Sequence, residues 1–262
     1  GIYFCCLPSS RNNKIYECHI SYNRRGIVLD HCIHYTLIAK CNISNNDVGI
    51  EVISASSHNL ISNNVFWKND IHAKDNCRNV WDSGSEFGGN YWEGHDSSIP
   101  YYIPGAGNNI DHYPLAAPYK NEPFIPFFSY EPVLPLVDQE IFFDGTLSFV
   151  SGNSSYLWDF GDGNFSTGCK VKHVYRREGW YNVTLCVTNE TKNNTFTRQV
   201  HVLRLHNGYI TVSVDANTTI QDAINLSKPG YTIYVKNGTY YETISINKPY
   251  LKIVGENRNT TV

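Results

Sequence analysis

A repeat of 23 residues in the first third of the chain constrains its fold more than any other feature. The segment 36–46 is followed 23 residues later by the segment 59–69, so that Ile38 matches Ile61. An earlier copy lies another 23 residues upstream, at Ile15, and residues 1–4 open a further copy with two extra residues in its following turn. A period of this length is typical of one coil of a solenoid.

Within each copy the apolar residues come in short alternating groups, such as Ile27 with Leu29 and Ile50 with Val52. This alternation predicts strands of a few residues joined by turns, whereas a helical repeat would need a spacing of 3.6 residues. Stacked coils would pair each strand with its copy in a parallel sheet. Asn pairs such as 45–46 suit the corners, because Asn tolerates a left-handed backbone and its amide can bond to its copy in the next coil.

The coil 59–69, with the pattern N-x-I-x-N-N-x-F-x-x-N, resembles the NosD-type right-handed β-helix family. The segments 80–84, 88–92 and 109–115 resemble the cap that closes such helices in archaeal surface proteins. The resemblance implies the last coils and the cap of a right-handed parallel β-helix over residues 1–116, and an archaeal host. Family members often carry a calcium loop inside the cap, which is replaced here by the short segment 93–98.

The middle of the chain predicts a different fold. Five prolines between residues 116 and 135 indicate an extended linker over 117–136, and the short alternating runs of 137–204 predict a β-sandwich. One hexapeptide there resembles the PKD domain, which implies an immunoglobulin-like sandwich with spacing and adhesive roles. Its residues are Trp158, Asp159, Phe160, Gly161, Asp162 and Gly163; the aromatic residues would enter the core, and the carboxylates would bond turn amides.

The last part of the chain, 205–262, resembles the N-terminal cap and first coils of a second β-helix. The segment 218–226 has the apolar spacing of one short helix, and 230–235 and 251–255 supply strands. We therefore expect an all-β protein with about 23 residues per coil in its β-helix.

Composition and charge favour an extracellular protein. The net charge of −3 leaves no basic stripe for nucleic acid, and no apolar run is long enough to span a membrane. Ten N-x-S/T sequons indicate a glycosylated surface. They begin at Asn42, Asn153, Asn164, Asn182, Asn189, Asn193, Asn217, Asn225, Asn237 and Asn259.

The eight cysteines lack the C-x-x-C spacing of zinc sites, so disulfides are the simpler interpretation. Cys18 and Cys41 occupy the same coil position, which would bring their Cα atoms within disulfide range. Two buried thiols or a metal-binding pair remain the alternatives.

Only one cluster has the residue types of a soft-metal site. Cys6, His31, Cys32 and His34 could hold copper, which the NosD resemblance also implies, whereas a solvated turn is the plainer interpretation. We assign no metal and no cofactor.

No column of carboxylates that would indicate catalysis recurs along the coils, so we predict a protein that is not an enzyme. The leading hypothesis is an extracellular structural or adhesive surface protein that assembles head to tail with itself through β-helix ends and contacts surface glycans. The alternative is a carbohydrate-binding or carbohydrate-cleaving β-helix, and the third is a copper-binding NosD-like protein.

Overall fold

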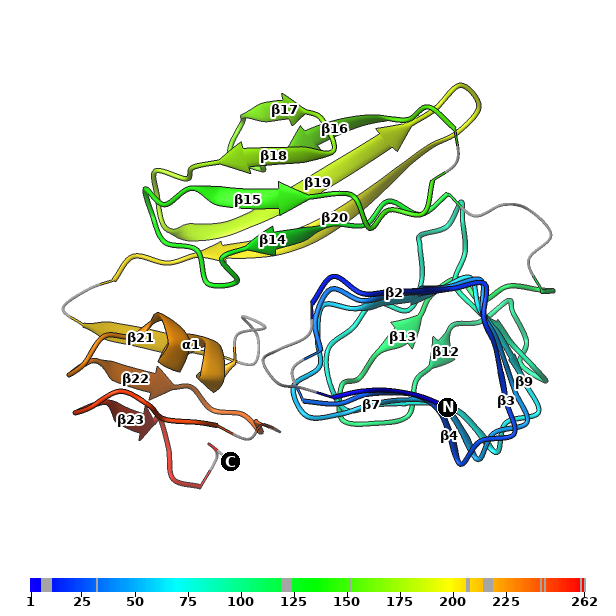
Figure 1. Cartoon of the computed structure of the whole chain (residues 1–262), viewed down its shortest axis with the longest axis horizontal. Coiled ribbons are helices and arrows are strands. Elements are labelled where there is room, and N and C mark those ends of the chain that lie inside the picture. The colour runs from blue at the N-terminus through cyan, green and yellow to red at the C-terminus, as the bar shows by residue number, and fades with distance from the viewer. Residues whose placement is uncertain are drawn as a thin grey trace. The chain divides into compact units, whose positions relative to one another are not determined.

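A computed structural model describes residues 1–5, 11–31, 33–118, 124–150, 152–205, 208–213, 219–240, 242, 244–259 and 261 (Figure 1). Contacts divide the chain into two compact units. The first unit contains Gly1–Phe127, Leu147–Ser154 and Asn189–Phe196, and the second unit contains Phe128–Thr146, Ser155–Thr188 and Thr197–Val262.

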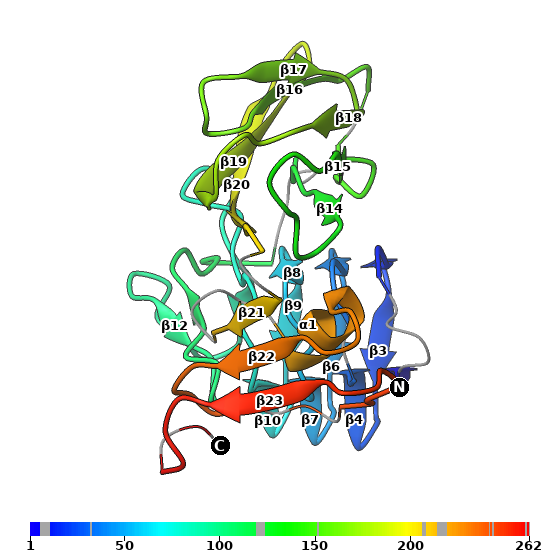
Figure 2. The ribbon, with the colours of Figure 1, turned by 90° about the vertical axis from the view of Figure 1, so that its left-hand side faces the viewer.

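The first unit contains a parallel β-helix built from three sheets, whose strands lie side by side in Figure 2. One sheet contains β1 (Ile2–Phe4), β4 (Arg25–Leu29), β7 (Val48–Val52) and β10 (Ile71–Asp75). The second contains β2 (Lys14–Tyr16), β5 (Leu37–Ala39) and β8 (Leu60–Ser62). The third contains β3 (His19–Ser21), β6 (Asn42–Ser44), β9 (Val65–Trp67) and β11 (Tyr91–Trp92).

The strand register confirms the repeat. Ile15 pairs with Ile38, and Ile38 pairs with Ile61, so each coil adds 23 residues. Ile2 pairs with Ile27, which accounts for the two extra residues predicted after the opening copy. Together with other apolar residues of the coils, these side chains form one continuous buried core, because matched residues such as Ile15, Ile38 and Ile61 belong to the same cluster.

Two buried carboxylates organise the closing cap. Asp75 Oδ2 accepts a hydrogen bond from the indole of Trp81 at 2.9 Å, and Asp111 Oδ2 accepts one from the indole of Trp92 at 2.8 Å. The Trp92 ring stacks on Phe66, with centroids 4.3 Å apart. The short strands β12 (Tyr101–Tyr102) and β13 (Ile110–Asp111) pair antiparallel, which ends the parallel stacking.

The sandwich consists of two antiparallel sheets. One sheet contains β14 (Ser129–Glu131), β15 (Ile141–Asp144) and β18 (Lys170–His173). The other contains β17 (Phe165–Thr167), β16 (Ser155–Asp159), β19 (Gly179–Thr188) and β20 (Asn193–Val202).

The range 117–136, which we expected to be an extended linker, differs from that expectation in its second half. β14 lies inside it and pairs with β15, and Phe128, Tyr130 and Leu134 are buried. Phe128 and Tyr130 are core residues, because this part of the Pro-rich sequence supplies an edge strand of the sandwich.

The second unit also contains a short parallel sheet of β21 (Tyr209–Val212), β22 (Thr232–Val235) and β23 (Lys252–Gly255). Helix α1 (Ile220–Leu226) packs on it through Ala223 and Ile224. The side chain of Thr219 accepts a hydrogen bond from the backbone N–H of Asp222 and thereby caps the helix. The short helix predicted in 218–226 is therefore confirmed.

Candidate binding groove and predicted site residues

Buried Asn side chains form a column along the coils of the first unit. The amide of Asn46 donates to Asn69 Oδ1 at 2.9 Å and to the backbone oxygen of Ile20 at 3.1 Å. Its Oδ1 accepts from the backbone N–H of Asn23 at 3.0 Å. Each amide therefore bonds to its copy in the neighbouring coil and to the backbone at the corner, as predicted for the Asn pairs.

Cys18 and Cys41 lie in the same column, because the neighbouring His19 pairs with Asn42. Both are thiols in the structure, so the predicted disulfide is not confirmed. Burial raises the pKa of Cys41 to about 12, and its Sγ donates to the backbone oxygen of Ala39 at 3.4 Å. Cys5, Cys169 and Cys186 form no disulfide among the described residues either.

Two of the four copper candidates, Cys6 and Cys32, lie outside the described residues. His31 Nδ1 lies 2.8 Å from Asp30 Oδ1, whereas His34 is buried with its Nδ1 3.1 Å from the backbone oxygen of Ser57. Within the described ranges no group of three His, Cys, Asp or Glu side chains could hold a metal ion. Each described histidine of the cluster thus has a partner within the protein.

The aromatic residues of the PKD-like hexapeptide lie in the sandwich core. Trp158 is fully buried and donates to the backbone oxygen of Gly168 at 2.7 Å, and Phe160 stacks on His173 at 4.0 Å. Asp159 Oδ1 accepts from the backbone N–H of Gly161 at 2.8 Å.

The second carboxylate of the hexapeptide also bonds to its own turn. Asp162 Oδ1 accepts from the N–H of Asn164 at 3.1 Å, while its Oδ2 lies 2.8 Å from His173 Nε2. Gly161 and Gly163 have positive φ angles of 72° and 91°, which the turn requires. These contacts give the hexapeptide a structural role.

The sequon asparagines are mostly exposed. Asn217 lies outside the described residues, and Asn189 is half-buried. The exposed ones are Asn42, Asn153, Asn164, Asn182, Asn193, Asn225, Asn237 and Asn259. No helix among the described residues is long and apolar enough to cross a membrane.

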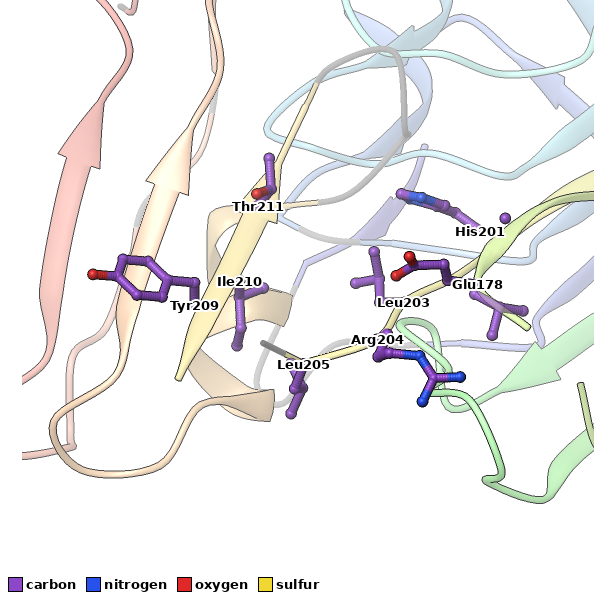
Figure 3. A pocket seen from close by; sticks show the side chains of 10 residues that line it. Glu178, His201, Leu203, Arg204, Leu205, Tyr209, Ile210 and Thr211 are labelled. Carbon is purple, nitrogen blue, oxygen red and sulfur yellow. The ribbon is translucent and has the colours of Figure 1, made fainter. Parts of the chain in front are cut away.

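Two hollows of the second unit share His201 and Thr211, and we call them together the His201 groove. The first has a volume of about 340 Å³ and is shown in Figure 3, where the Glu178 carboxylate lies near the His201 ring. It is lined by residues 178–179, 201–205 and 209–211. The second has a volume of about 450 Å³ and is lined by Trp180, His201, Thr211, Ser213, Lys236, Asn237 and Glu256.

The Trp180 and His201 rings stack inside this groove. Their centroids are 4.1 Å apart, and their planes differ by 1°. Burial lowers the pKa of His201, although the nearby Glu178 opposes this shift. The imidazole is therefore neutral at pH 7, and its buried Nδ1 has no hydrogen-bond partner among the described residues.

An ion pair borders the second hollow. Lys236 Nζ lies 2.8 Å from Glu256 Oε1, and Glu256 Oε2 accepts from the backbone N–H of Asn237 at 2.9 Å.

This groove was not predicted from the sequence. A signal was present in the alternation of 179–188, which places Trp180 on the outer face of its sheet, but its partner depends on the antiparallel register.

Two families match separate parts of the chain. Residues 3–97 match the family described as "Periplasmic copper-binding protein (NosD)", and residues 135–203 match the PKD domain.

Curated relatives share shorter stretches. The collagenase ColA of Clostridium perfringens is 30% identical over 121 residues, which are 45% of this chain and 11% of the collagenase. Collagenase ColQ1 of Bacillus cereus is 58% identical over 36 residues, 14% of this chain and 4% of that protein. Human polycystin-1-like protein 1 is 34% identical over 73 residues, 28% of this chain and 2% of that protein. The chain thus spans about a tenth or less of these relatives.

A solved structure described as "Structural basis for the promiscuous specificity of the carbohydrate-binding modules from the beta-sandwich super family" aligns with a TM-score of 0.29 and 30% identity. The alignment covers 30% of this chain and 34% of the chain in the solved structure. The family matches agree with the two architectures in the structure. The chain therefore combines a NosD-type parallel β-helix with a PKD domain.

Proposed function

We propose that this chain is an extracellular structural or adhesive protein in which β-helical rods are joined through the PKD sandwich. The observation that carries the proposal is the buried Asn column, in which Asn23, Asn46 and Asn69 bond to one another from coil to coil. Such a column gives the backbone groups at each corner a hydrogen-bond partner inside the protein, and it stiffens the stack. A stiff rod and a spacer are the parts that a surface protein needs.

Two ion pairs between neighbouring coils support a structural role. Glu17 pairs with Lys40 at 3.0 Å. Glu51 pairs with Arg25 at 3.0 Å. Both pairs hold neighbouring coils together, whereas a lyase or hydrolase would direct its carboxylates toward a substrate.

Assembly through β-helix ends extends this proposal. Among the described residues, β1 pairs only with β4, and β23 pairs only with β22. Such edges offer backbone donors and acceptors to a further parallel strand. We infer that coils from another β-helical segment continue these sheets, either within a longer chain or from a neighbouring copy, which would propagate head to tail.

An extracellular location agrees with the exposed sequon asparagines and with the periplasmic description of the NosD family. A competing hypothesis, suggested by the word copper in that description, is that Cys6, His31, Cys32 and His34 bind copper. Copper titration with mass spectrometry tests it. Stoichiometric binding that is lost in His31→Ala would replace the structural proposal with a metal-binding one.

Light scattering and electron microscopy of the purified chain test assembly. We expect fibres or concentration-dependent oligomers, and Ile253→Pro in β23 should abolish them. The backbone N–H groups of Lys252 and Glu256 bond to β22, so by alternation the N–H of Ile253 lies on the free edge, where proline removes a donor. Val187→Ala in the sandwich core serves as a control that destabilises the protein without touching an edge. A chain that stays monomeric at high concentration refutes assembly between copies, and turnover of a polysaccharide panel refutes the structural role.

A further inference from the structure

Trp180 is the most conspicuous side chain of the His201 groove because its indole is exposed and already held in one orientation. It lies on β19, the residue is 46% exposed, and one face of its indole rests on the His201 ring of β20. A ligand that packs on the free face would immobilise no flexible side chain. Binding therefore costs little conformational entropy, which favours a platform for a flat ligand.

Polar groups surround this platform. The second hollow is lined by the hydroxyl residues Thr211 and Ser213 and by Asn237. The Lys236 ammonium donates hydrogen bonds and the Glu256 carboxylate accepts them, and their 2.8 Å contact places both functions at one point. A ligand that carries many hydroxyl groups, each both donor and acceptor, matches this lining.

The charges of the groove balance. Lys236 offsets Glu256 in the second hollow, and Arg204 offsets Glu178 in the first. His201 adds no charge at pH 7, because burial lowers its pKa. A polyanion such as an acidic polysaccharide or a nucleic acid would meet as many carboxylates as cations, so the lining favours a neutral ligand.

We propose that the His201 groove is a carbohydrate-binding site that takes a neutral saccharide, with one sugar ring on the exposed face of Trp180. The C–H groups on one face of a hexose would pack on the indole, and the ring hydroxyls would bond to Lys236, Glu256 and Asn237. This inference does not rest on the structural role proposed above. It gives the second unit a ligand of its own.

Isothermal titration calorimetry with defined oligosaccharides tests the proposal. The probes are neutral hexasaccharides of glucose, mannose, galactose and N-acetylglucosamine, with hexagalacturonate and a Gly-Ser peptide for comparison. The full chain is produced without N-glycosylation, because Asn237 begins a sequon and a glycan there would occupy the groove. At least one neutral saccharide should bind and should quench tryptophan fluorescence.

Two variants make the result specific. Trp180→Ala should weaken binding about tenfold or more, and Trp180→Phe should restore part of it, because a smaller aromatic face remains. Trp67→Ala is the matched control, since Trp67 is 39% exposed on β9 of the first unit and should change affinity less than twofold.

Three outcomes overturn the proposal. They are the absence of binding by every neutral probe at millimolar concentration, tighter binding of hexagalacturonate or of the peptide, and an equal loss of affinity in Trp67→Ala and Trp180→Ala. Circular dichroism of each variant shows that it is folded, so a loss of binding can be assigned to the groove.

Discussion

The β-helix and the sandwich both exclude water from a continuous core, but they treat polar side chains in opposite ways. In the coils, Asn46, Asn59 and Asn64 are buried and bonded to the next coil. In the sandwich, the core consists of aromatic and branched residues such as Trp158, and the carboxylates of the hexapeptide stay at the turns.

The difference follows from symmetry. Coils stacked by one constant translation place a side chain beside the equivalent side chain of the next coil, so an amide can bond to an amide one coil away, as Asn46 does to Asn69. Antiparallel sheets have no such translation, so a buried amide in the sandwich would need a partner of its own. The stability of the coils therefore depends on repeated hydrogen bonds, and the stability of the sandwich depends on close packing of its buried side chains.

The largest expected effect is the loss of volume in the sandwich. Trp158→Ala removes a fully buried indole and its bond to Gly168, and it should lower the free energy of unfolding of the second unit by about 4–5 kcal/mol. Urea unfolding with hydrogen exchange resolved by unit measures it. Trp180→Ala, on the exposed face, should cost less than about 1 kcal/mol. Equal losses would contradict a core built on volume.

The pH dependence of the cap tests the buried carboxylates of the β-helix. Burial raises the pKa of Asp75 to about 7 from an ordinary value of 3.8. The folded cap favours the protonated acid. The contribution of Asp75 to the stability of the cap is therefore greatest below about pH 4 and decreases as the pH rises toward 7. Above pH 7 this group causes no further change. The loss is at most on the order of 4 kcal/mol.

Asp75→Asn should flatten this dependence, as followed by urea unfolding at several pH values. A smaller slope should remain, because burial also raises the pKa of Asp111 to about 6. A stability that increases from pH 4 to pH 7 in the wild-type cap would reverse the predicted sign.

The Asn column should show a penalty for lost polar partners. Asn46→Ala removes the bonds to Ile20, Ser44 and Asn69 and should cost the first unit about 3 kcal/mol in urea unfolding. Asn46→Leu should cost as much although it restores volume, because the backbone groups remain unpaired. Asn23→Ala, at the half-buried end of the column, should cost about 1 kcal/mol. If Asn46→Leu is as stable as the wild-type protein, the Asn column stabilises the coils by filling space and not by its hydrogen bonds.

The smallest effect is expected at an exposed contact between the same coils. Glu17 and Lys40 are one coil apart. The Lys40 side chain is only 9% exposed, but the Glu17 side chain is 56% exposed, so water and salt screen its carboxylate. Glu17→Gln should change the free energy of unfolding by no more than about 0.5 kcal/mol, an effect that 1 M salt removes. A loss comparable to that of Asn46→Ala would show that exposed contacts between coils matter as much as buried ones.

The coils could be predicted from sequence because one alignment of the repeat determines every strand pair. Once Ile38 is matched to Ile61, the pairing of Ile43 with Phe66 follows, and the structure has it. The hexapeptide 158–163 similarly indicated the sandwich, because its aromatic residues and turn glycines occupy fixed positions.

The remaining features depend on contacts that no local pattern specifies. Phe128 and Tyr130 belong to the sandwich core, but they lie among prolines that are typical of linkers. The indole partner of Asp75 depends on how the cap folds back on the last coil. The stacking of Trp180 on His201 depends on the register of two long antiparallel strands.

Hydrogen exchange at the backbone amide of Asn46 tests the central claim, that buried amide columns hold the coils together, most directly. This N–H donates to Asn69 Oδ1 at 3.0 Å inside the stack. We predict that it exchanges only through global unfolding of the first unit, and that Asn69→Ala accelerates its exchange by at least a hundredfold while amides of β20 are unchanged. Rapid exchange in the wild-type protein, or no acceleration in Asn69→Ala, would contradict the claim.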